Sequence, residues 1–371
     1  MDYWTVEECC EILDSMRVPI TASDRKCGPY PYYGANGIQD HVAEYIFDDE
    51  LVLLAEDGGN FGSKERPIAY RVSGKCWVNN HAHVLRPKKG LDVDYLCYSL
   101  MFYDVSGLVN GATRQKLTQA DMRKMLIPMR SIAEQKDIVQ RIRAVERIIA
   151  SRQRQLRALD TLIKARFVEM FGDPETNPMG WEQVTLGDVC SSIVRGPFGS
   201  ALKKEFFVDP DATTYKVYEQ KHAIQKSATI GTYYITAEKF NELRRFECVA
   251  GDILMSCSGT MGELYQLPEG CERGIINQAL CKLTLNEKIL PVCFLVYMRQ
   301  TIGNLETKGS GIQNIAAVSY LKAMPINLPP MKVQEAFATF VSQVDKSKVV
   351  VQKALEEAQL LFDSLMQKYF D

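Results

Sequence analysis

One long pattern occurs twice in this chain, with its two copies 199 residues apart. Each copy opens on a proline-containing lead, LIPMRSIAEQ from Leu126 to Gln135 and PINLPPMKVQ from Pro325 to Gln334. Apolar residues then follow at alternating spacings of four and three, which is the heptad pattern of a helix that packs along another helix. The first helix is predicted from about Ala133 to Met170, and at 1.5 Å per residue each helix is roughly 57 Å long.

Two helices with the same period most simply pair with each other as an antiparallel coiled coil that acts as a spacer. A single helix of this kind is equally typical of the core of an ordinary bundle, but two copies in register favour pairing. The residues predicted to form the seam are Ile138, Ile142, Val145, Ile149, Leu156, Leu159 and Ile163 in the first helix, and Phe337, Val341, Val344, Val351, Leu355, Phe362 and Leu365 in the second.

Shorter stretches ahead of each helix also repeat. LVLLAEDGGNFG, from Leu51, matches GDILMSCSGTMG, from Gly251, and VNNHA, from Val78, matches IINQA, from Ile275. The segments between these markers read as short strands, glycine and proline turns and isolated helices. We therefore expect an α+β fold with a pseudo-twofold internal repeat, in which residues 1–115 and 174–312 form two modules and residues 116–173 and 313–371 each form a proline turn with a spacer helix.

Composition excludes several classes of protein. The 371 residues carry a net charge of −2, so a general electrostatic attraction to nucleic acid is not indicated, and any such contact needs local patches. The apolar runs are shorter than the ~18 residues of a membrane span, and the acidic start MDYWTVEECCE is unlike a signal peptide, so we expect a cytoplasmic protein. Eleven cysteines without a C-x-x-C pair predict reduced, mostly buried thiols, with one reactive cysteine as the alternative.

Motifs for catalysis are not met. DGGNFG follows an apolar strand, but Pro67 interrupts any helix after it, so a nucleotide-binding glycine turn is not indicated. NLPPM, from Asn327, has a leucine and a methionine where the catalytic loop of a DNA methyltransferase needs Asn-Pro-Pro-aromatic. His81 and His83 lack a nearby group of further ligands, so we expect no metal and no cofactor.

The arrangement of two modules and two long helices resembles the specificity subunit of type I restriction-modification systems. The resemblance covers the whole chain and rests on YPYYGANGI, GDILMSCSGTMG, NNHA with INQA, IPMRSIAEQKDIV, FVEMFGD and INLPPMKVQEAF. The second half has no copy of YYGANGI and reads RGPFGSALKKEFF, from Arg195, instead.

The resemblance implies two tandem target-recognition domains separated by the coiled coil. It also implies that the chain is not catalytic, that each domain reads one half of a bipartite double-stranded DNA site, and that the chain holds two methyltransferase subunits and, in the full complex, restriction and translocation subunits. The rival hypothesis is a coiled-coil scaffold for proteins that does not read DNA.

Base reading requires amide, hydroxyl and basic side chains presented in loops. The predicted DNA-binding residues of the first module are Arg25, Lys26, Tyr32, Tyr33, Asn36, Asn60, Lys64, Arg66, Asn79, Asn80 and His81. Those of the second module are Arg195, Ser200, Lys203, Lys204, Ser256, Ser258, Thr260, Asn277, Gln278 and Lys308. Any one of them can equally be a satisfied turn residue, and the loops around Asn60 with Thr260 and Asn80 with Asn277 are favoured because they recur at matching places.

Overall fold

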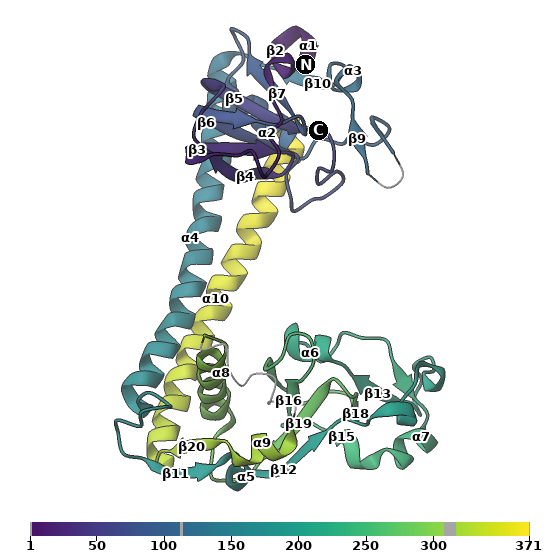
Figure 1. The fold of residues 1–371 in the computed structure, drawn as a ribbon, viewed down its shortest axis with the longest axis vertical. Coiled ribbons are helices and arrows are strands. Elements are labelled where there is room, and N and C mark those ends of the chain that lie inside the picture. The colour runs from purple at the N-terminus through teal and green to yellow at the C-terminus, as the bar shows by residue number, and fades with distance from the viewer. Residues whose placement is uncertain (1, 112–113, 308–316, 371) are drawn as a thin grey trace. The chain divides into compact units, whose positions relative to one another are not determined.

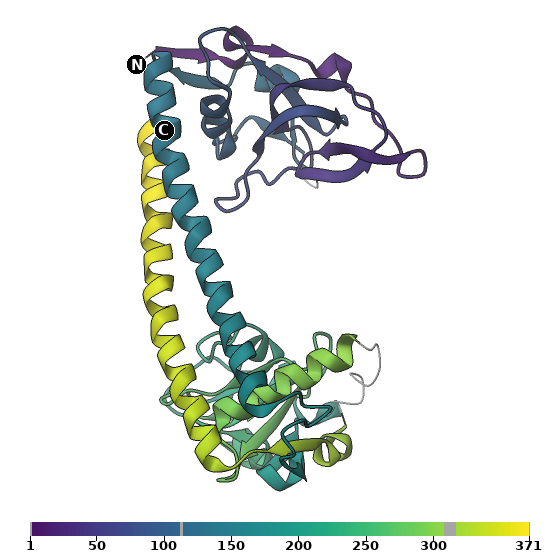
Figure 2. The same ribbon diagram turned by 90° about the vertical axis from the view of Figure 1, so that its left-hand side faces the viewer.

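The computed structural model describes residues 2–111, 114–307 and 317–370. The chain divides into two compact units, which we call unit 1 (Met1–Arg154 with Val351–Asp371) and unit 2 (Gln155–Val350). Two long helices, α4 (Ile132–Phe171) and α10 (Met331–Phe370), contribute residues to both units. Figures 1 and 2 show these two helices side by side.

Unit 1 is built on a six-stranded sheet with the strand order β2-β7-β5-β6-β3-β4, in which β3 pairs with β6 in parallel and the other neighbours are antiparallel. The strands of unit 1 as a whole are β1 (Asp2–Thr5), β2 (Cys10–Ile12), β3 (Cys27–Gly34), β4 (Gly37–Val42), β5 (Phe47–Ala55), β6 (Ala69–Val78), β7 (Ala82–Pro87), β8 (Val109–Asn110), β9 (Lys116–Leu117) and β10 (Leu126–Met129). Its shorter helices are α1 (Val6–Cys9), η1 (Asp14–Met16), α2 (Val93–Met101) and α3 (Gln119–Met122).

Unit 2 contains two four-stranded sheets, ordered β12-β19-β16-β17 and β14-β13-β18-β15. Its strands are β11 (Glu182–Thr185), β12 (Cys190–Arg195), β13 (Tyr215–Tyr218), β14 (Tyr234–Ile235), β15 (Glu247–Cys248), β16 (Ile253–Ser256), β17 (Leu264–Gln266), β18 (Gly274–Ile276), β19 (Leu280–Leu285) and β20 (Pro325–Leu328). Its helices are α5 (Leu186–Val189), η2 (Gly199–Ala201), η3 (Lys204–Phe206), α6 (Gln220–Ile224), α7 (Ala237–Glu242), η4 (Arg244–Phe246), α8 (Pro291–Thr307) and α9 (Val318–Ala323).

The repeat is visible in the hydrogen bonds at the start of each long helix. The buried Gln135 side chain accepts a bond from the backbone N–H of Asp92 at 2.8 Å and donates to two carbonyl oxygens at 2.9 Å. Gln334 is also buried; it accepts from the backbone N–H of Leu290 at 2.8 Å and donates to two carbonyl oxygens at 3.0 Å. The glutamine at the end of each proline lead therefore joins the long helix to the start of an earlier helix of the same unit, α2 or α8.

The strands before each long helix repeat as well. β1 pairs antiparallel with β10 in unit 1, and β11 pairs antiparallel with β20 in unit 2. Each first strand is followed by a helix with a capping box, made by Thr5 with Glu8 and by Thr185 with Asp188. The parallel pair of β3 and β6 has a counterpart in β13 and β18, which aligns Tyr33 with Tyr218.

The helices pack against each other within each unit. In unit 2, the rings of Phe167 and Phe171 contact Phe337 with centroids 5.5 and 5.2 Å apart, and Lys348 pairs with Asp160 at 2.6 Å. In unit 1, the apolar core joins Ile142 and Val145 to Phe362. Early residues of α4 thus meet late residues of α10, which makes the pair antiparallel and confirms the predicted α+β fold with paired long helices.

The residues predicted for the seam are all at least partly buried. Ile138, Ile142, Val145, Ile163, Phe337, Val341, Val344 and Phe362 are buried, and Ile149, Leu156, Leu159, Val351, Leu355 and Leu365 are half-buried. The buried seam residues also pack on the sheets and short helices of their own unit, because they belong to the apolar cores of the two units. All eleven cysteines are free, and all but Cys27 and Cys271 are buried.

Candidate nucleic-acid interface

Three loops of unit 1 come together at one edge of its sheet. The Asn36 side chain, between β3 and β4, donates to the carbonyl of Gly58 in the loop after β5 at 2.9 Å. His81, between β6 and β7, contacts Asp57 of the same loop through Nδ1 at 2.6 Å. The structure therefore brings together predicted residues that lie far apart in the chain.

The turn between β6 and β7 is fixed by its first asparagine. The backbone N–H of Asn79 donates to the carbonyl of Tyr33 at 3.0 Å, and its side-chain oxygen accepts from the N–H of His81 at 2.8 Å. Asn79 is only 3% exposed, whereas the next residue, Asn80, is exposed. The turn thus uses one amide to hold its shape and presents a second amide at its tip.

Unit 2 repeats this turn between β18 and β19. The N–H of Asn277 donates to the carbonyl of Tyr218 at 2.9 Å, and its side-chain oxygen accepts from the N–H of Ala279 at 3.0 Å. Gln278 follows and is exposed. Both units therefore place an exposed amide side chain one residue after a turn-fixing asparagine.

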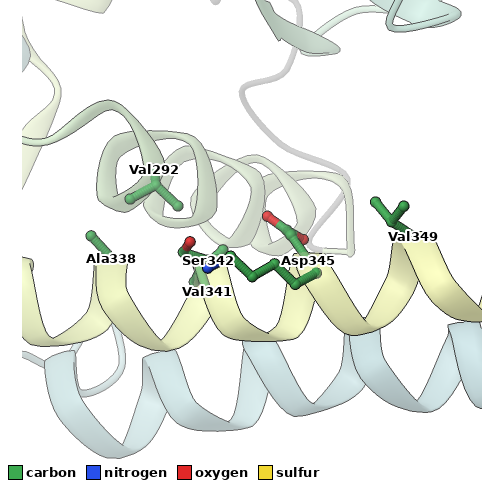
Figure 3. Close-up of a pocket in the computed structure, with 7 residues that line it drawn as sticks. Val292, Ala338, Val341, Ser342, Asp345 and Val349 are labelled. Carbon is green, nitrogen blue, oxygen red and sulfur yellow. The ribbon is translucent and has the colours of Figure 1, made fainter.

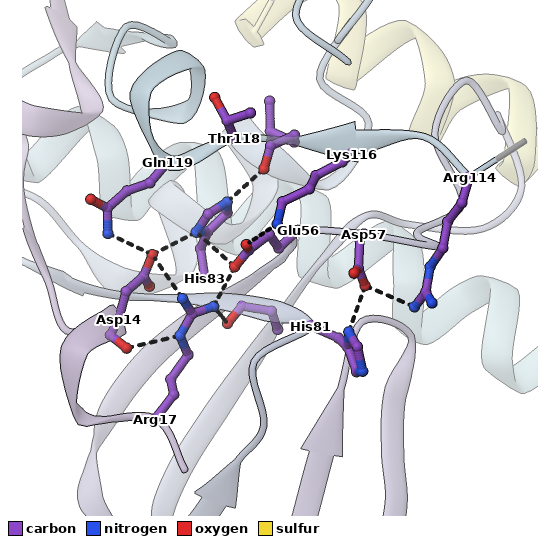
Figure 4. Close-up of polar contacts among 12 residues, drawn as sticks. Asp14, Arg17, Glu56, Asp57, His81, His83, Arg114, Lys116, Thr118 and Gln119 are labelled. Carbon is purple, nitrogen blue, oxygen red and sulfur yellow. Dashed lines mark hydrogen bonds and ion pairs between the residues drawn. The ribbon is translucent and has the colours of Figure 1, made fainter. Parts of the chain in front are cut away.

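A buried polar network lies beneath the loops of unit 1 (Figure 4). His83 contacts Asp14 through Nδ1 at 2.6 Å and the carbonyl of Leu117 through Nε2 at 3.0 Å. Arg17 donates to Glu56 at 2.5 Å and to the carbonyl of Ala82 at 2.8 Å. These bonds tie η1, the end of β5, β7 and β9 into one rigid support.

The carboxylate of Asp14 is held in its charged form within this network. Burial by itself raises the pKa of Asp14, but hydrogen bonds from His83, Gln119 and the N–H of Val84 outweigh burial, so that the pKa lies below its ordinary value.

The same network contains ligand types suited to a metal ion. One ligand atom from each of Asp14, Glu56 and His83 lies within 4.8 Å of the others. Arg17 and Lys116 pair with these carboxylates, at 2.5 and 3.0 Å from Glu56, so protein cations already neutralise the acidic groups. The arrangement is therefore that of a buried salt-bridge network that stabilises the sheet edge.

Two basic residues that sequence reasoning did not select border the loops of unit 1. Arg114 pairs with Asp57 at 2.9 Å, and its side chain is 60% exposed. Lys116 is half-exposed beside Glu56. The backbone N–H of Leu117 donates to the carbonyl of Glu56 at 2.7 Å, and this bond holds the segment with Arg114 and Lys116 next to the loop after β5. Such a long-range pairing cannot be predicted from the sequence, so the two basic residues were missed.

In unit 2, Gln220 fixes the loop after β16, in which Ser258 and Thr260 were predicted. Its side chain donates to the carbonyls of Ser258 and Thr260, the latter at 3.0 Å. Sequence reasoning missed Gln220, because it lies about 40 residues from its partners and belongs to no recognisable motif.

Arg195 lies beside this loop at the end of β12. One of its terminal nitrogens donates to the carbonyl of Cys257 at 3.3 Å, and its guanidinium stands 5.9 Å from the ring of Phe198, which is 70% exposed. Burial lowers the pKa of Arg195 from its ordinary value, although an arginine remains charged at neutral pH. Its Nε and Nη1 atoms make no hydrogen bond to the described residues.

Gly196 explains why Arg195 can approach the Asn277 turn. A Cβ atom at position 196 would lie 1.9 Å from the carbonyl oxygen of Asn277, a distance no side chain tolerates. The N–H of Gly196 also donates to the carbonyl of Leu280 at 3.0 Å. The glycine therefore brings Arg195 and the turn with Gln278 into one cluster.

Three predicted residues lie beneath the loops and are not presented at the surface. The hydroxyl of Tyr32 bonds with the backbone of Ile20, and the hydroxyl of Ser256 accepts from the N–H of Glu263 at 2.9 Å. Tyr32, Ser256 and Asn79 are at most 3% exposed. This differs from the expectation of direct DNA contact, because a side chain in the core cannot reach a base edge.

The other predicted residues are more dispersed. Arg25 stacks on Tyr32 and pairs with Asp40 at 3.3 Å, and Lys203 pairs with Glu205 at 3.5 Å. The exposed members of this group are Lys26, Lys64, Arg66, Ser200, Lys203 and Lys204, whereas Arg25, Tyr33 and Asn60 are half-buried. Lys308 lies outside the described residues.

A family of known proteins matches most of the chain. The sequence model of the type I restriction modification DNA specificity domain matches residues 1–160 and 178–359. A protein of Haemophilus influenzae, whose name describes it as a type I restriction enzyme specificity subunit, is 27% identical over all of this chain and 93% of its own length. The MjaVIII specificity subunit of Methanocaldococcus jannaschii is 25% identical over 52% of this chain and 42% of its own length.

Solved structures share the fold. The S subunit of a type I restriction-modification system from M. genitalium aligns over all of this chain and 96% of its own, with a TM-score of 0.54 and 14% identity. A chain from a study of complex assembly and conformational transition of the type I R-M system aligns over all of this chain and 97% of its own, with a TM-score of 0.60 and 16% identity. Within the described part of the chain, no helix has the length and apolar character needed to cross a membrane.

Proposed function

Because the chain belongs to the type I restriction-modification DNA specificity domain family, we propose that it reads a bipartite double-stranded DNA site, one half with each unit. The observation that supports this best is the repeated turn, which exposes Asn80 in unit 1 and Gln278 in unit 2. An asparagine or glutamine amide can both accept from N6 and donate to N7 of adenine in the major groove. Each unit therefore carries one side chain of the type that reads adenine, on a turn of fixed shape.

The residues around each turn supply complementary contacts. In unit 1, the exposed side chains of Arg114 and Lys116 provide positive charge for phosphates. In unit 2, Arg195 supports the loop from within, because its Nε and Nη1 atoms are buried. The backbone of each loop is bonded to its own unit, so these groups need little ordering when DNA binds. The boundaries 1–115 and 174–312 remain our proposal for the two recognition domains.

We also propose that α4 and α10 fix the distance between the half-sites and hold two methyltransferase subunits, with restriction and translocation subunits added in the full complex. The chain itself acts in recognition and not in catalysis, and it works in the cytoplasm beside the DNA. Insertion of whole heptads into both helices is expected to lengthen the gap in the methylated sequence and to leave both half-sites unchanged.

The test is an exchange of one recognition domain. Residues 174–312 are replaced by the corresponding domain of another specificity subunit, and methylated adenines are mapped across the DNA of a host that carries the complex. We expect one half of the methylated sequence to change. A change in both halves, or in neither, would show that the units do not read DNA independently.

The rival hypothesis, a protein scaffold without DNA reading, is disfavoured by the family to which the chain belongs. Binding of the chain and its methyltransferase to duplex DNA separates the two hypotheses. DNA reading predicts affinity that falls steeply with salt, together with an excess for one sequence over others. Equal affinity for all sequences would support the scaffold.

A further inference from the structure

The internal repeat separates the side chains that the shared fold needs from those that differ between the units. In unit 1, Asp94 of α2 pairs with Arg143 of α4 at 2.7 Å. The corresponding residues of unit 2 are Val292 of α8 and Ser342 of α10, because the buried glutamine of each proline lead bonds just before α2 or α8. Figure 3 shows these two side chains beside a shallow groove. An ion pair that unit 1 has and unit 2 lacks is therefore not required by the shared fold.

The same comparison applies to the turns that follow β6 and β18. The N–H of Glu56 donates to the carbonyl of His81 at 2.9 Å, and the N–H of Cys257 donates to the carbonyl of Ala279 at 2.8 Å. The N–H groups of His81 and Ala279 each donate to the side-chain oxygen of the asparagine two residues earlier. His81 and Ala279 therefore occupy corresponding positions on the same backbone frame.

Unit 1 adds a pair of side chains to this frame. Nδ1 of His81 lies 2.6 Å from a carboxylate oxygen of Asp57. The residues at these places in unit 2 are Ala279 and Ser258, and an alanine has no polar side chain with which to form such a bond. The turn of unit 2 keeps the same backbone bonds without the pair, so the pair of Asp57 and His81 is not needed to shape the turn.

Asp57 decides which nitrogen of the His81 ring carries the proton. An ionised carboxylate only accepts hydrogen bonds, so the ring proton lies on Nδ1. The same oxygen of Asp57 accepts from Arg114 at 2.9 Å, and Figure 4 shows this carboxylate in contact with both side chains. The charge of Asp57 already has a partner in Arg114, so a neutral ring leaves no carboxylate charge unbalanced. In the neutral ring with its proton on Nδ1, Nε2 is a hydrogen-bond acceptor.

Nε2 is also the part of the ring that a ligand can reach. Among the described residues it has no hydrogen-bond partner, and the side chain of His81 is 34% exposed. The backbone N–H, the carbonyl and Nδ1 of this residue are all bonded within unit 1. The acceptor is therefore held in place before DNA binds, which lowers the entropy lost on binding.

We propose that Nε2 of His81 accepts a hydrogen bond from the amino group of one base in the half-site of unit 1, and that Asp57 is the positioning residue that sets this tautomer. The base is adenine or cytosine, whose N6 and N4 amino groups face the major groove. The inference rests on the proposed function and adds the chemical group that is read. Ala279 cannot make this contact, so the contact belongs to unit 1.

The first experiment locates the base. The chain in complex with its methyltransferase selects duplexes from a library with randomised half-sites, and the bound duplexes are sequenced. His81→Ala introduces the residue that unit 2 has at this place, so the turn is kept, and we expect the preference at one position to fall roughly fivefold with the others unchanged. Glu65→Gln removes an exposed acid from the loop after β5 and should leave every preference unchanged.

The second experiment removes single groups from the base that is located in this way. Purine replaces adenine, or pyrimidinone replaces cytosine, to remove the amino group, and a further duplex lacks the N7 atom of the purine in the same base pair. Fluorescence anisotropy measures Kd. Loss of the amino group should raise the Kd of the wild type roughly fivefold more than that of His81→Ala, whereas loss of N7 should affect both chains equally.

Asp57→Asn tests the positioning role. Arg114 retains the amide oxygen, so the amide N–H₂ donates to Nδ1 of His81 and the ring proton moves to Nε2, which becomes a donor. We expect the coupling between His81 and the amino group to disappear and the preference at this one position to shift to another base. Circular dichroism, together with unchanged preferences at all other positions of both half-sites, shows that the variant is folded.

The outcomes separate this inference from the function on which it rests. Equal binding of all sequences by the wild-type complex would refute the proposed function itself. Selective binding by the wild type, with preferences that His81→Ala leaves unchanged or weakens for every sequence alike, would overturn the inference and leave the proposed function intact. Coupling of His81 to N7 in place of the amino group would show that Nε2 donates. That result, or an Asp57→Asn variant that still couples to the amino group, would also overturn the inference.

Discussion

Replacement of Gln135 by methionine should destabilise unit 1 by about 3 kcal/mol, because it removes three hydrogen bonds from a buried site while nearly conserving volume. The bonds join Gln135 to the N–H of Asp92 at 2.8 Å and to the carbonyls of Gly90 and Arg130 at 2.9 Å. A buried group left without its partner costs about 1–3 kcal/mol, and three such groups are affected. The lower end of that range already gives about 3 kcal/mol.

The assay is hydrogen exchange measured by mass spectrometry, with urea unfolding as a second measure. A loss of about 3 kcal/mol speeds exchange of the core amides of unit 1 by roughly 150-fold where exchange requires global opening of that unit. Gln140→Met, at an exposed position of the same helix, is the matched control and should leave exchange unchanged. Gln334→Met should produce the same loss in unit 2 through the corresponding bonds to Leu290 and its neighbours.

The reasoning would be refuted if Gln135→Met changed the stability of unit 1 by less than about 1 kcal/mol, the average net value of one hydrogen bond. Such a result would mean that the three backbone groups find other partners when the amide is removed. It would also be refuted if Gln140→Met were equally damaging, because the effect would then come from the helix surface and not from the buried bonds.

Three further predictions concern other sites. Because the pKa of Asp14 is lower in the folded state, its stabilising effect is present above the unfolded pKa of about 4 and is lost as the pH falls through the folded value, so the stability gap between wild type and Asp14→Asn in urea unfolding should narrow from pH 6 to pH 3. Asn80→Ala and Gln278→Ala should each raise the Kd for the cognate DNA by about 10- to 100-fold in fluorescence anisotropy, each through one half-site. Phe167→Ala should cost unit 2 about 3–5 kcal/mol in the same unfolding assay, because its fully buried ring stacks on Phe171 at 4.5 Å.

The long helices were predictable from the sequence almost to the residue. The heptad pattern placed the first helix from about Ala133 to Met170, and α4 runs from Ile132 to Phe171. Periodicity is a local property, and a proline lead marks the start of each helix, so no knowledge of distant contacts was needed. The repeated markers VNNHA and IINQA also predicted that the two turns correspond, but they matched Asn80 with Asn277. This register was wrong by one residue, because the hydrogen bonds make Asn79 the counterpart of Asn277 and Asn80 the counterpart of Gln278.

The interior of each recognition unit was less predictable, since it depends on which strands pair. In sequence order, the segment from Arg195 takes the place of YYGANGI in the second half. In the structure, however, the counterpart of β3, which contains Tyr33, is β13, which ends at Tyr218. Burial of Tyr32 and Ser256, and the contacts of Gln220 with its loop, follow from the same long-range pairing. Polar residue types in a loop therefore identified the region of the candidate interface but did not separate the supporting side chains from the exposed ones.

The two amide residues of each turn differ in how freely they can be substituted. In each turn, the asparagine that bonds to the backbone precedes the amide that faces outward, Asn79 before Asn80 and Asn277 before Gln278. Substitution of an exposed residue usually changes stability by less than about 0.5 kcal/mol, whereas loss of a buried bond costs several times more. If the exposed amide contacts DNA as we propose, it can vary with the target sequence, whereas loss of the asparagine before it would destabilise the turn. The two units can thus keep the same turn and read different bases.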